Sequence, residues 1–187
     1  MAPTEPRVTV HMVASLDGYI VDGEGGVAWL ETSDEYAGGV EHEDPAAFLA
    51  TIGCWVIGSR TYEAALELGW PYGDKPTYVL TSRDLVSDRD SVHFRSGDLR
   101  RLFEEELRPN HGTVWVCGGA TLVKELLQHD LVDELCTTIA PVLVGDGLPF
   151  FDRIGVLRAL HLKDVKAYRT GSVELWYDVV GRGTRSD

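Results

Sequence analysis

Three short segments of this sequence combine glycine, hydroxyl and arginine side chains in a pattern suited to binding phosphate. They are residues 58–61 (Gly-Ser-Arg-Thr), 81–83 (Thr-Ser-Arg) and 118–122 (Gly-Gly-Ala-Thr-Leu). Glycine lets backbone amides approach a ligand closely, and a helix N-terminus offers unpaired N–H groups and a favourable dipole to an anion. A glycine pair alone is often an ordinary turn. Three such junctions together predict a ligand that carries phosphate.

The elements that would position these segments follow from the spacing of the apolar residues. Strands are expected at residues 8–14, 54–57, 77–81, 91–94, 114–116, 132–140, 160–167 and 172–180, and helices at 44–52, 58–67, 97–107 and 120–128. Strands that alternate with helices and end in an antiparallel pair predict an α/β fold, with a mostly parallel sheet and helices on both faces. Ligands of such sheets bind at the carboxyl ends of the strands, where the three segments lie.

One domain accounts for all 187 residues, with 1–7 as a flexible lead-in and 181–187 as a flexible tail. Residues 22–26 (Asp-Gly-Glu-Gly-Gly) are too glycine-rich to begin a partner strand. They are expected to form a loop anchored by Trp29 and Leu30, either a mobile cover over a site or an ordinary surface loop. Residues 141–151 are expected to be a loop with apolar content.

Composition excludes several classes of function. The formal net charge of −13 argues against nucleic-acid or anionic-membrane surfaces, which need basic patches. Cys54, Cys117 and Cys136 each lie in an apolar run, which is typical of free thiols in a reducing compartment. The N-terminus lacks a signal-peptide core, and no apolar run approaches membrane-spanning length. These observations favour a cytoplasmic protein.

The common nucleotide, metal and nucleophile motifs are absent from the sequence. It contains neither GxGxxG nor GxxxxGK[ST], and its six histidines are scattered without a His-x-x-x-His or Cys-x-x-Cys spacing. No metal site is therefore expected. A serine hydrolase would need Gly-x-Ser-x-Gly, which is also missing. Cys117 lies beside the glycine pair, but no histidine is placed by sequence to activate it.

Five segments in order resemble the dihydrofolate reductase-like superfamily. They are residues 14–20 (ASLDGYI), 56–63 (VIGSRTYE), 79–82 (VLTS), 116–122 (VCGGATL) and 139–145 (IAPVLVG). The resemblance runs from about residue 8 to residue 180 and is strongest to the free-standing branch related to the C-terminal reductase domain of the riboflavin-biosynthesis deaminase/reductase. It implies a three-layer fold with a central sheet of about eight strands, and NADPH as the cofactor.

The resemblance also implies which residues bind the cofactor. The turn at 118–122 would meet the pyrophosphate, 58–61 the adenosine-side phosphates, 81–83 the ribose 2′-phosphate, and the first strand the nicotinamide. The residues concerned are Ala14, Ile20, Gly58, Ser59, Arg60, Thr61, Thr81, Ser82, Arg83, Gly118, Gly119, Ala120, Thr121 and Leu122. Arg60 and Arg83 would select NADP over NAD, unless both are simply solvated surface arginines. Ser59 stands where the superfamily often has arginine, which weakens the assignment of Arg60.

The substrate is less defined by the sequence. Asp17 and Asp44 are the candidate substrate-binding or catalytic acids, although Asp17 could instead bond to its own turn and Asp44 could cap a helix. Tyr19, Trp29 and Phe48 could form a stacking wall for a flat heterocycle, or belong to the core.

Three functions remain open on these grounds. The riboflavin-pathway reductases usually carry a lysine two residues before the alanine of the first strand, where this chain has Met12. Their Asp-Asp-Pro-x-Leu-x-x-Arg run is also absent from residues 64–71. An NADPH-dependent reductase of a pterin- or pyrimidine-like substrate is thus favoured over a ribosylaminopyrimidine reductase or a non-catalytic nucleotide-binding protein. A homodimer is expected, with Trp176 and Tyr177 in its interface.

Overall fold

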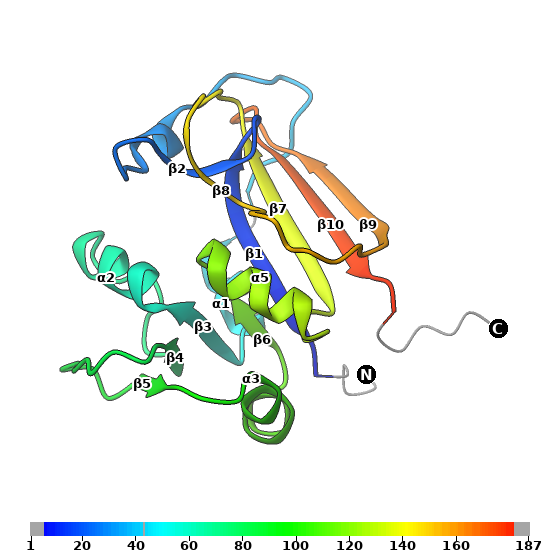
Figure 1. Cartoon of the computed structure of the whole chain (residues 1–187). Helices are drawn as coiled ribbons and strands as arrows, with labels where there is room; N and C mark the ends of the chain where they lie inside the picture. The colour runs from blue at the N-terminus through cyan, green and yellow to red at the C-terminus, as the bar shows by residue number, and fades with distance from the viewer. Residues whose placement is uncertain (1–5, 43, 182–187) are drawn as a thin grey trace.

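The computed structural model describes residues 6–42 and 44–181, and its centre is one eight-stranded sheet (Figure 1). The strand order is β5-β4-β3-β6-β1-β7-β10-β9. The strands are β1 (Val8–Ser15), β3 (Cys54–Gly58), β4 (Thr77–Leu80), β5 (Val92–Arg95), β6 (Val114–Val116), β7 (Glu134–Ala140), β9 (Leu160–Ala167) and β10 (Val173–Val179). All neighbours from β5 to β7 are parallel, whereas β10 runs antiparallel to β7 and to β9. The expected architecture is confirmed.

Helices cover both faces of the sheet because its central strands are apolar on both sides. Alternate side chains of a strand point to opposite faces. In β3, Cys54 and Val56 join the larger core with α5 (Ala120–Gln128) and η2 (Leu102–Leu107), while Trp55 and Ile57 join a second core with α2 (Ser59–Glu67). The short helix α1 (Pro45–Thr51) also packs on that second side, through Phe48 and Leu49.

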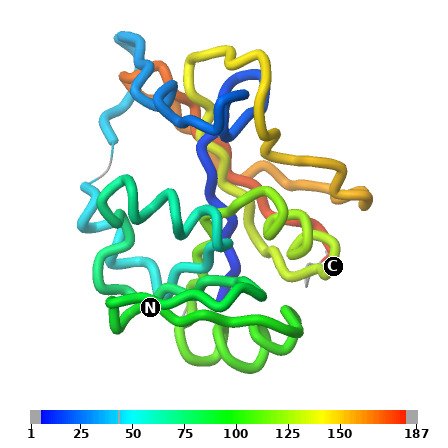
Figure 2. The backbone as a smooth tube through the Cα atoms, turned by 60° about the vertical axis from the view of Figure 1, so that its left-hand side comes forward, coloured from blue at the N-terminus to red at the C-terminus, as the bar shows by residue number. Residues whose placement is uncertain are grey.

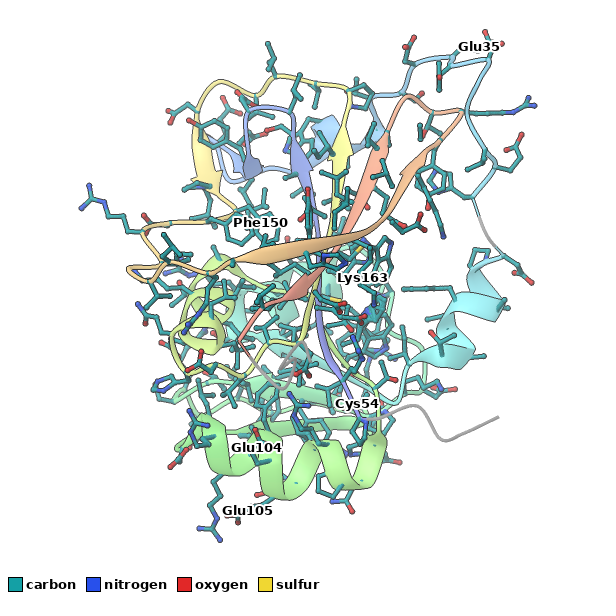
Figure 3. The ribbon with its side chains drawn as sticks, turned by 90° about the vertical axis from the view of Figure 1, so that its right-hand side faces the viewer. Glu35, Cys54, Glu104, Glu105, Phe150 and Lys163 are labelled. Carbon is teal, nitrogen blue, oxygen red and sulfur yellow. The ribbon has the colours of Figure 1, made fainter. Side chains whose placement is uncertain are left out.

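The expected helix 97–107 extends further and has three parts. Asp98 caps α3 (Leu99–Arg101) by accepting a hydrogen bond from the Arg101 amide, and η2 and α4 (Arg108–His111) follow without a break. Its acidic residues mostly face solvent, as expected: Glu105 is exposed, and Glu104 forms an ion pair with Arg108 one turn along (Figure 3).

The loop expected at residues 141–151 contains one strand of a second, two-stranded sheet, so this prediction was wrong in part. The strand β2 (Tyr19–Asp22) pairs antiparallel with β8 (Gly147–Pro149), and residues 23–26, where a loop was expected, contain no strand. Figure 2 shows the two segments side by side at one end of the molecule. Phe150, which follows β8, is buried (Figure 3). The partners lie far apart in the sequence, so no local pattern indicated the pairing.

Hydrogen bonds to Asp17 link the turn after β1 to the loop that leads into β8. Its carboxylate accepts hydrogen bonds from the Ser15 hydroxyl at 2.6 Å, from the Val144 amide at 3.1 Å and from the Gly145 amide at 2.7 Å. These bonds, above all the one from Ser15, lower the pKa of Asp17. The Asp17 carboxylate therefore holds the turn after β1 against the loop at residues 144–145.

The three cysteines are free thiols, and Cys54 and Cys136 are buried. Burial raises the pKa of Cys54 and of Cys117 to about 12, which keeps both thiols protonated near neutral pH. Among the described residues, no helix is long and apolar enough to cross a membrane. The expected lead-in and tail lie mostly outside the described residues, which begin with Pro6 and end with Gly181.

Candidate functional site

A groove of about 1240 Å³ runs along the carboxyl ends of five neighbouring strands, β5, β4, β3, β6 and β1. Sites for one drug-sized ligand usually measure roughly 300–1,000 Å³. The groove is thus large enough for a dinucleotide together with a small second ligand. It lies at the edge of the sheet where parallel α/β folds bind their ligands.

Two glycine junctions meet in the middle of this groove. Because β3 and β6 are parallel neighbours, the residues that follow them come together: the Gly58 amide donates a hydrogen bond to the Gly118 carbonyl at 2.8 Å. The helices α2 and α5 start here, with Gly58 and Gly119 as N-cap residues and no side-chain cap at either end. Uncapped first-turn amides from two helices can bind the oxygens of an anion.

Gly118 and Gly119 differ in backbone conformation and in the space that a side chain would have at each position. Their peptide bond is cis, and Gly118 has a φ of 92°, a conformation that favours glycine. A Cβ on Gly118 would lie 2.9 Å from Cε of Met12, whereas a Cβ on Gly119 would meet only Oγ1 of Thr61, at 3.7 Å. Gly118 is needed for the fold, and Gly119 keeps the groove open.

The arginines at the strand ends differ in where they point. Arg60 and Arg95 line the groove. Arg83 instead makes two hydrogen bonds to Glu63, at 2.6 and 3.0 Å, and these bonds lower the pKa of Glu63. The Arg95 guanidinium lies 5.5 Å from the centre of the Tyr78 ring and 3.6 Å from the Glu106 carboxylate. Arg95, at the end of β5, therefore lines the groove beside the end of β4, where Arg83 had been expected to bind the ribose 2′-phosphate.

Most of the residues expected to bind the cofactor line the groove, and three do not. Those that line it are Ile20, Gly58, Ser59, Arg60, Thr61, Thr81, Ser82, Gly119, Ala120, Thr121 and Leu122. Gly118 lies behind them, Arg83 is paired with Glu63, and Ala14 is buried in β1. The hydroxyl of Thr81 accepts a hydrogen bond from the Arg83 amide at 3.0 Å, which shapes the turn after β4.

The acids expected at the substrate site have structural contacts instead. Asp44 caps α1 by accepting a hydrogen bond from the Ala46 amide at 3.0 Å, and Asp17 holds the turn after β1. Neither lines the groove. The bond of Asp44 is local, whereas Asp17 accepts hydrogen bonds both from Ser15 in its own turn and from the distant Val144 and Gly145 amides. In the structure, Asp44 therefore caps a helix and Asp17 bonds to its own turn, which are the two structural alternatives considered from the sequence.

The aromatic residues expected at the substrate site are divided. Phe48 of α1 lines the groove, whereas Tyr19 of β2 and Trp29 of η1 (Ala28–Glu31) do not. The Phe48 ring meets the Trp115 ring edge-on, with centroids 4.9 Å apart. Near Trp29, it is Val27 and Leu30 that line the groove, so the segment borders the site with its aliphatic residues.

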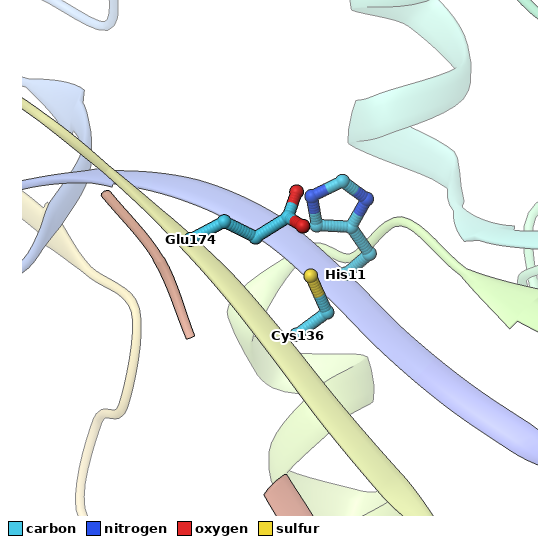
Figure 4. Close-up of side chains that lie close together, drawn as sticks. All are labelled: His11, Cys136 and Glu174. Carbon is cyan, nitrogen blue, oxygen red and sulfur yellow. The ribbon is translucent and has the colours of Figure 1, made fainter. Parts of the chain in front are cut away.

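Sequence reasoning did not identify several residues of the groove. They include His11, Met12, Trp55, Tyr72, Arg95 and Cys117. Of these residues, His11 is a titratable side chain on β1, and its Nε2 lies 3.1 Å from the Thr138 hydroxyl. Burial lowers the pKa of His11, and the nearby Glu174 carboxylate opposes this shift (Figure 4). Its position at the centre of an apolar strand resembled an ordinary core residue, and only strand pairing reveals its neighbours.

Comparison with known proteins identifies chains that are similar over most of the length of this one. The model of the RibD C-terminal domain family matches residues 6–174. The uncharacterized protein YwjB of Bacillus subtilis is 32% identical over 177 residues, covering 92% of this chain and 98% of YwjB. The riboflavin biosynthesis protein RibD of Corynebacterium ammoniagenes is 27% identical over 157 residues, covering 76% of this chain and 45% of RibD. The resemblance expected from the sequence is confirmed.

Solved structures with low identity share the fold. A protein from Shewanella sp. PV-4 superposes with a TM-score of 0.82 at 24% identity, covering 94% of this chain and 99% of that one. A Thermotoga maritima deaminase/reductase gives 0.64 at 14% identity, covering 94% and 57%. Dihydrofolate reductase from Enterococcus faecalis, complexed with NADP(H), gives 0.59 at 16% identity, covering 95% and 98%. The dihydrofolate reductase-like fold is thereby confirmed.

The two glycines at 118–119 should respond differently to alanine. We expect Gly119→Ala to fold as the wild type does but to weaken NADPH binding at least about tenfold, because a methyl group between amide and phosphate costs roughly one charge-assisted hydrogen bond. Gly118→Ala should lower the melting temperature by several degrees, because the residue has a positive φ that alanine adopts only with strain, and the flexible end of Met12 would have to move aside. Fluorescence titration and thermal melts measure both. Unchanged NADPH affinity in Gly119→Ala would exclude phosphate from this turn.

Proposed function

We propose, since this chain belongs to the RibD C-terminal domain family, that it is an NADPH-dependent reductase that transfers hydride to a small pterin- or pyrimidine-like heterocycle. The observation that carries the proposal is the single groove, in which two uncapped helix N-termini adjoin an aromatic-walled end. Two of the similar structures are a deaminase/5-amino-6-(5-phosphoribosylamino)uracil reductase and a dihydrofolate reductase complexed with NADP(H). When bound, NADPH supplies the hydride.

The residues present fit the phosphates of a dinucleotide. We assign the pyrophosphate to the first-turn amides of α2 and α5, with Arg60 as the nearby cation and the hydroxyls of Thr61 and Thr121 as donors. Gly119 leaves these amides accessible. The chain as a whole is strongly acidic, so this local set of donors must hold the phosphates against an unfavourable net field.

The 2′-phosphate of NADPH is assigned to the outer part of the groove, at the ends of β4 and β5. Thr81 and Ser82 follow β4. Arg95 is the last residue of β5, which pairs with β4, and Ser96 follows it. Arg95 already lines the groove, whereas Arg83 would first have to leave Glu63. Arg95 is therefore the primary cation in this assignment, and Arg83 an auxiliary one.

The substrate is assigned to the opposite end of the groove, beside β1 and α1. His11, Phe48 and Leu30 line this end, and the edge of Phe48 is fixed against Trp115. Flat heterocycles bind well between apolar and aromatic side chains. Hydride transfer requires mainly that donor and acceptor carbons be held close together without water, which such a wall provides.

Two alternatives are distinguished by experiment. One is the ribosylaminopyrimidine reductase of riboflavin synthesis, which the departures at Met12 and at residues 64–71 disfavour. The other is a nucleotide-binding protein that retains the fold without turnover, because a fold does not by itself establish a reaction.

We expect the purified protein to bind NADPH and to oxidise it when a suitable acceptor is present. Reduced-nicotinamide fluorescence measures binding, and absorbance at the nicotinamide band measures oxidation with dihydrofolate, 7,8-dihydrobiopterin and 5-amino-6-(5-phosphoribosylamino)uracil. Binding without oxidation of NADPH by any of the three would favour the non-catalytic alternative. Absence of binding at millimolar NADPH would exclude both.

Cofactor preference should depend on the arginines at the outer end of the groove. We expect Arg95→Gln to weaken NADPH binding by about 10- to 100-fold and to leave NADH binding nearly unchanged, as expected for a charge-assisted bond to one phosphate. Arg83→Gln should have a smaller effect of the same kind, and Arg89→Gln, outside the groove, serves as the control. Equal losses for NADPH and NADH would show that Arg95 does not select the 2′-phosphate.

We also propose a cytoplasmic homodimer, consistent with the three free thiols. The rings of Trp176 and Trp115 lie 5.9 Å apart inside the chain, and Tyr177 packs on the larger core, so neither is fully free for an interface. The edge strand β9 is the better surface, since it exposes Leu160, Leu162 and Val165. Sedimentation at micromolar concentration should show a dimer, and Leu162→Lys should shift it toward monomer. A wild-type monomer would reject the proposal.

A further inference from the structure

Three chemically active side chains lie together on one face of the sheet, beside the substrate end of the groove. His11 of β1, Cys136 of β7 and Glu174 of β10 place a ligand atom each within 4.8 Å of one another (Figure 4). The sheet register produces this cluster, because His11 pairs with Cys136, and Glu174 pairs with Thr138 on the far side of β7. Of the three, His11 is the one that also lines the groove.

The imidazole of His11 is held from two sides. Its Nε2 lies 3.1 Å from the Thr138 hydroxyl, and its ring meets the edges of Phe48 and Trp115, with centroid distances of 6.4 and 5.6 Å. Figure 4 shows one ring nitrogen turned toward Glu174 and the other turned away from it. No hydrogen bond is found for this second nitrogen among the described residues, and His11 is one of the residues that line the groove.

Glu174 is fixed behind this ring as a buried carboxylate. Its side chain is 9% exposed, and Oε1 accepts a hydrogen bond from the indole N–H of Trp176 at 2.6 Å. A carboxylate beside a buried imidazole favours the protonated ring, whereas burial disfavours it. These two effects act in opposite directions on the pKa of His11, with burial the larger. The protonation of the ring therefore depends on two opposing features of the structure, the burial of His11 and the neighbouring Glu174 carboxylate.

The same cluster is less suited to a metal ion. A metal would need the Cys136 thiolate, but burial raises the pKa of this thiol. It would also compete with Trp176 for Glu174 and with Thr138 for the ring nitrogen of His11. The titratable groups that face His11 are Glu174 and Cys136, while α1 and β6 contribute the Phe48 and Trp115 rings.

We propose that His11 is the proton donor of the reductase reaction, and that Glu174 is the positioning residue that orients and stabilises its protonated ring. This inference rests on the proposed function and adds the acid that hydride transfer to a heterocycle requires. The carbon of a C=N or C=O bond receives the hydride of NADPH, which leaves as NADP⁺. The adjoining nitrogen or oxygen takes the proton of the His11 imidazolium. Solvent then returns a proton to His11, so each turnover consumes one NADPH and one proton.

The activity test compares pH profiles on the acceptor that the wild type reduces. Wild-type kcat should be highest below the pKa of His11 and fall as pH rises through it, because only the protonated ring donates. His11→Gln retains a polar side chain for Thr138 and should lower kcat about 100-fold or more, abolish this pH dependence and leave NADPH affinity unchanged. Glu174→Gln should move the fall in kcat to lower pH, because the ring loses its stabilising charge. Cys136→Ala is the matched control and should keep the wild-type profile.

A second measurement does not depend on turnover. NMR titration of ring-labelled histidine should show one resonance, missing in His11→Gln, whose pKa falls further in Glu174→Gln and stays unchanged in Cys136→Ala. A wild-type pH profile in His11→Gln, or a His11 pKa that does not respond to Glu174→Gln, would overturn the proton donor while leaving the reductase intact. Activity that requires added Zn²⁺ and is lost in Cys136→Ala would replace it with a metal site. A wild-type protein without turnover would overturn the proposed function and, with it, the proton step.

Discussion

The candidate site depends on one backbone contact between two neighbouring strands. The parallel pairing of β3 with β6 brings the Gly58 amide to within 2.8 Å of the Gly118 carbonyl, and two helices start at this point. Of the three glycines at these turns, Gly118 is the one with a positive φ, whereas a Cβ on Gly58 or Gly119 would meet its neighbours at 3.7 Å or more. Everything proposed for the cofactor phosphates follows from two sets of helix amides that open into one groove.

The charged side chains that line the groove include two arginines and one glutamate, Glu125. The chain has a formal net charge of −13, yet Arg60 and Arg95 line the groove. Many acidic groups are occupied elsewhere: Asp17 holds two loops, Asp44 caps a helix, and Glu63 pairs with Arg83. None of these three acidic residues lines the groove. The proposed binding of phosphate thus rests on backbone geometry and on two cations.

The two ends of the groove have different physical characters. The outer end, after β4 and β5, is polar and contains hydroxyls and an arginine, whereas the inner end beside β1 and α1 is bordered by aromatic rings. At this apolar end, His11 and Glu174 are two ionisable side chains that lie beside aromatic rings. A buried carboxylate next to an imidazole has its greatest effect where water is excluded. The exclusion of water from this end would therefore serve both steps of the proposed reaction, the proton transfer from His11 and the hydride transfer.

The sequence by itself determined the order and type of nearly all main elements, and the glycine junctions that border the groove. These features are local: apolar spacing specifies strands and helices, and glycine specifies where a ligand can approach the backbone. Only the tertiary structure decided that Arg83 pairs with Glu63, that Arg95 lines the groove, that β2 pairs with β8, and that His11 meets Glu174. Each of these depends on strand order and register. A shift of one residue in the register would turn a side chain to the other face of the sheet, and no local pattern specifies it.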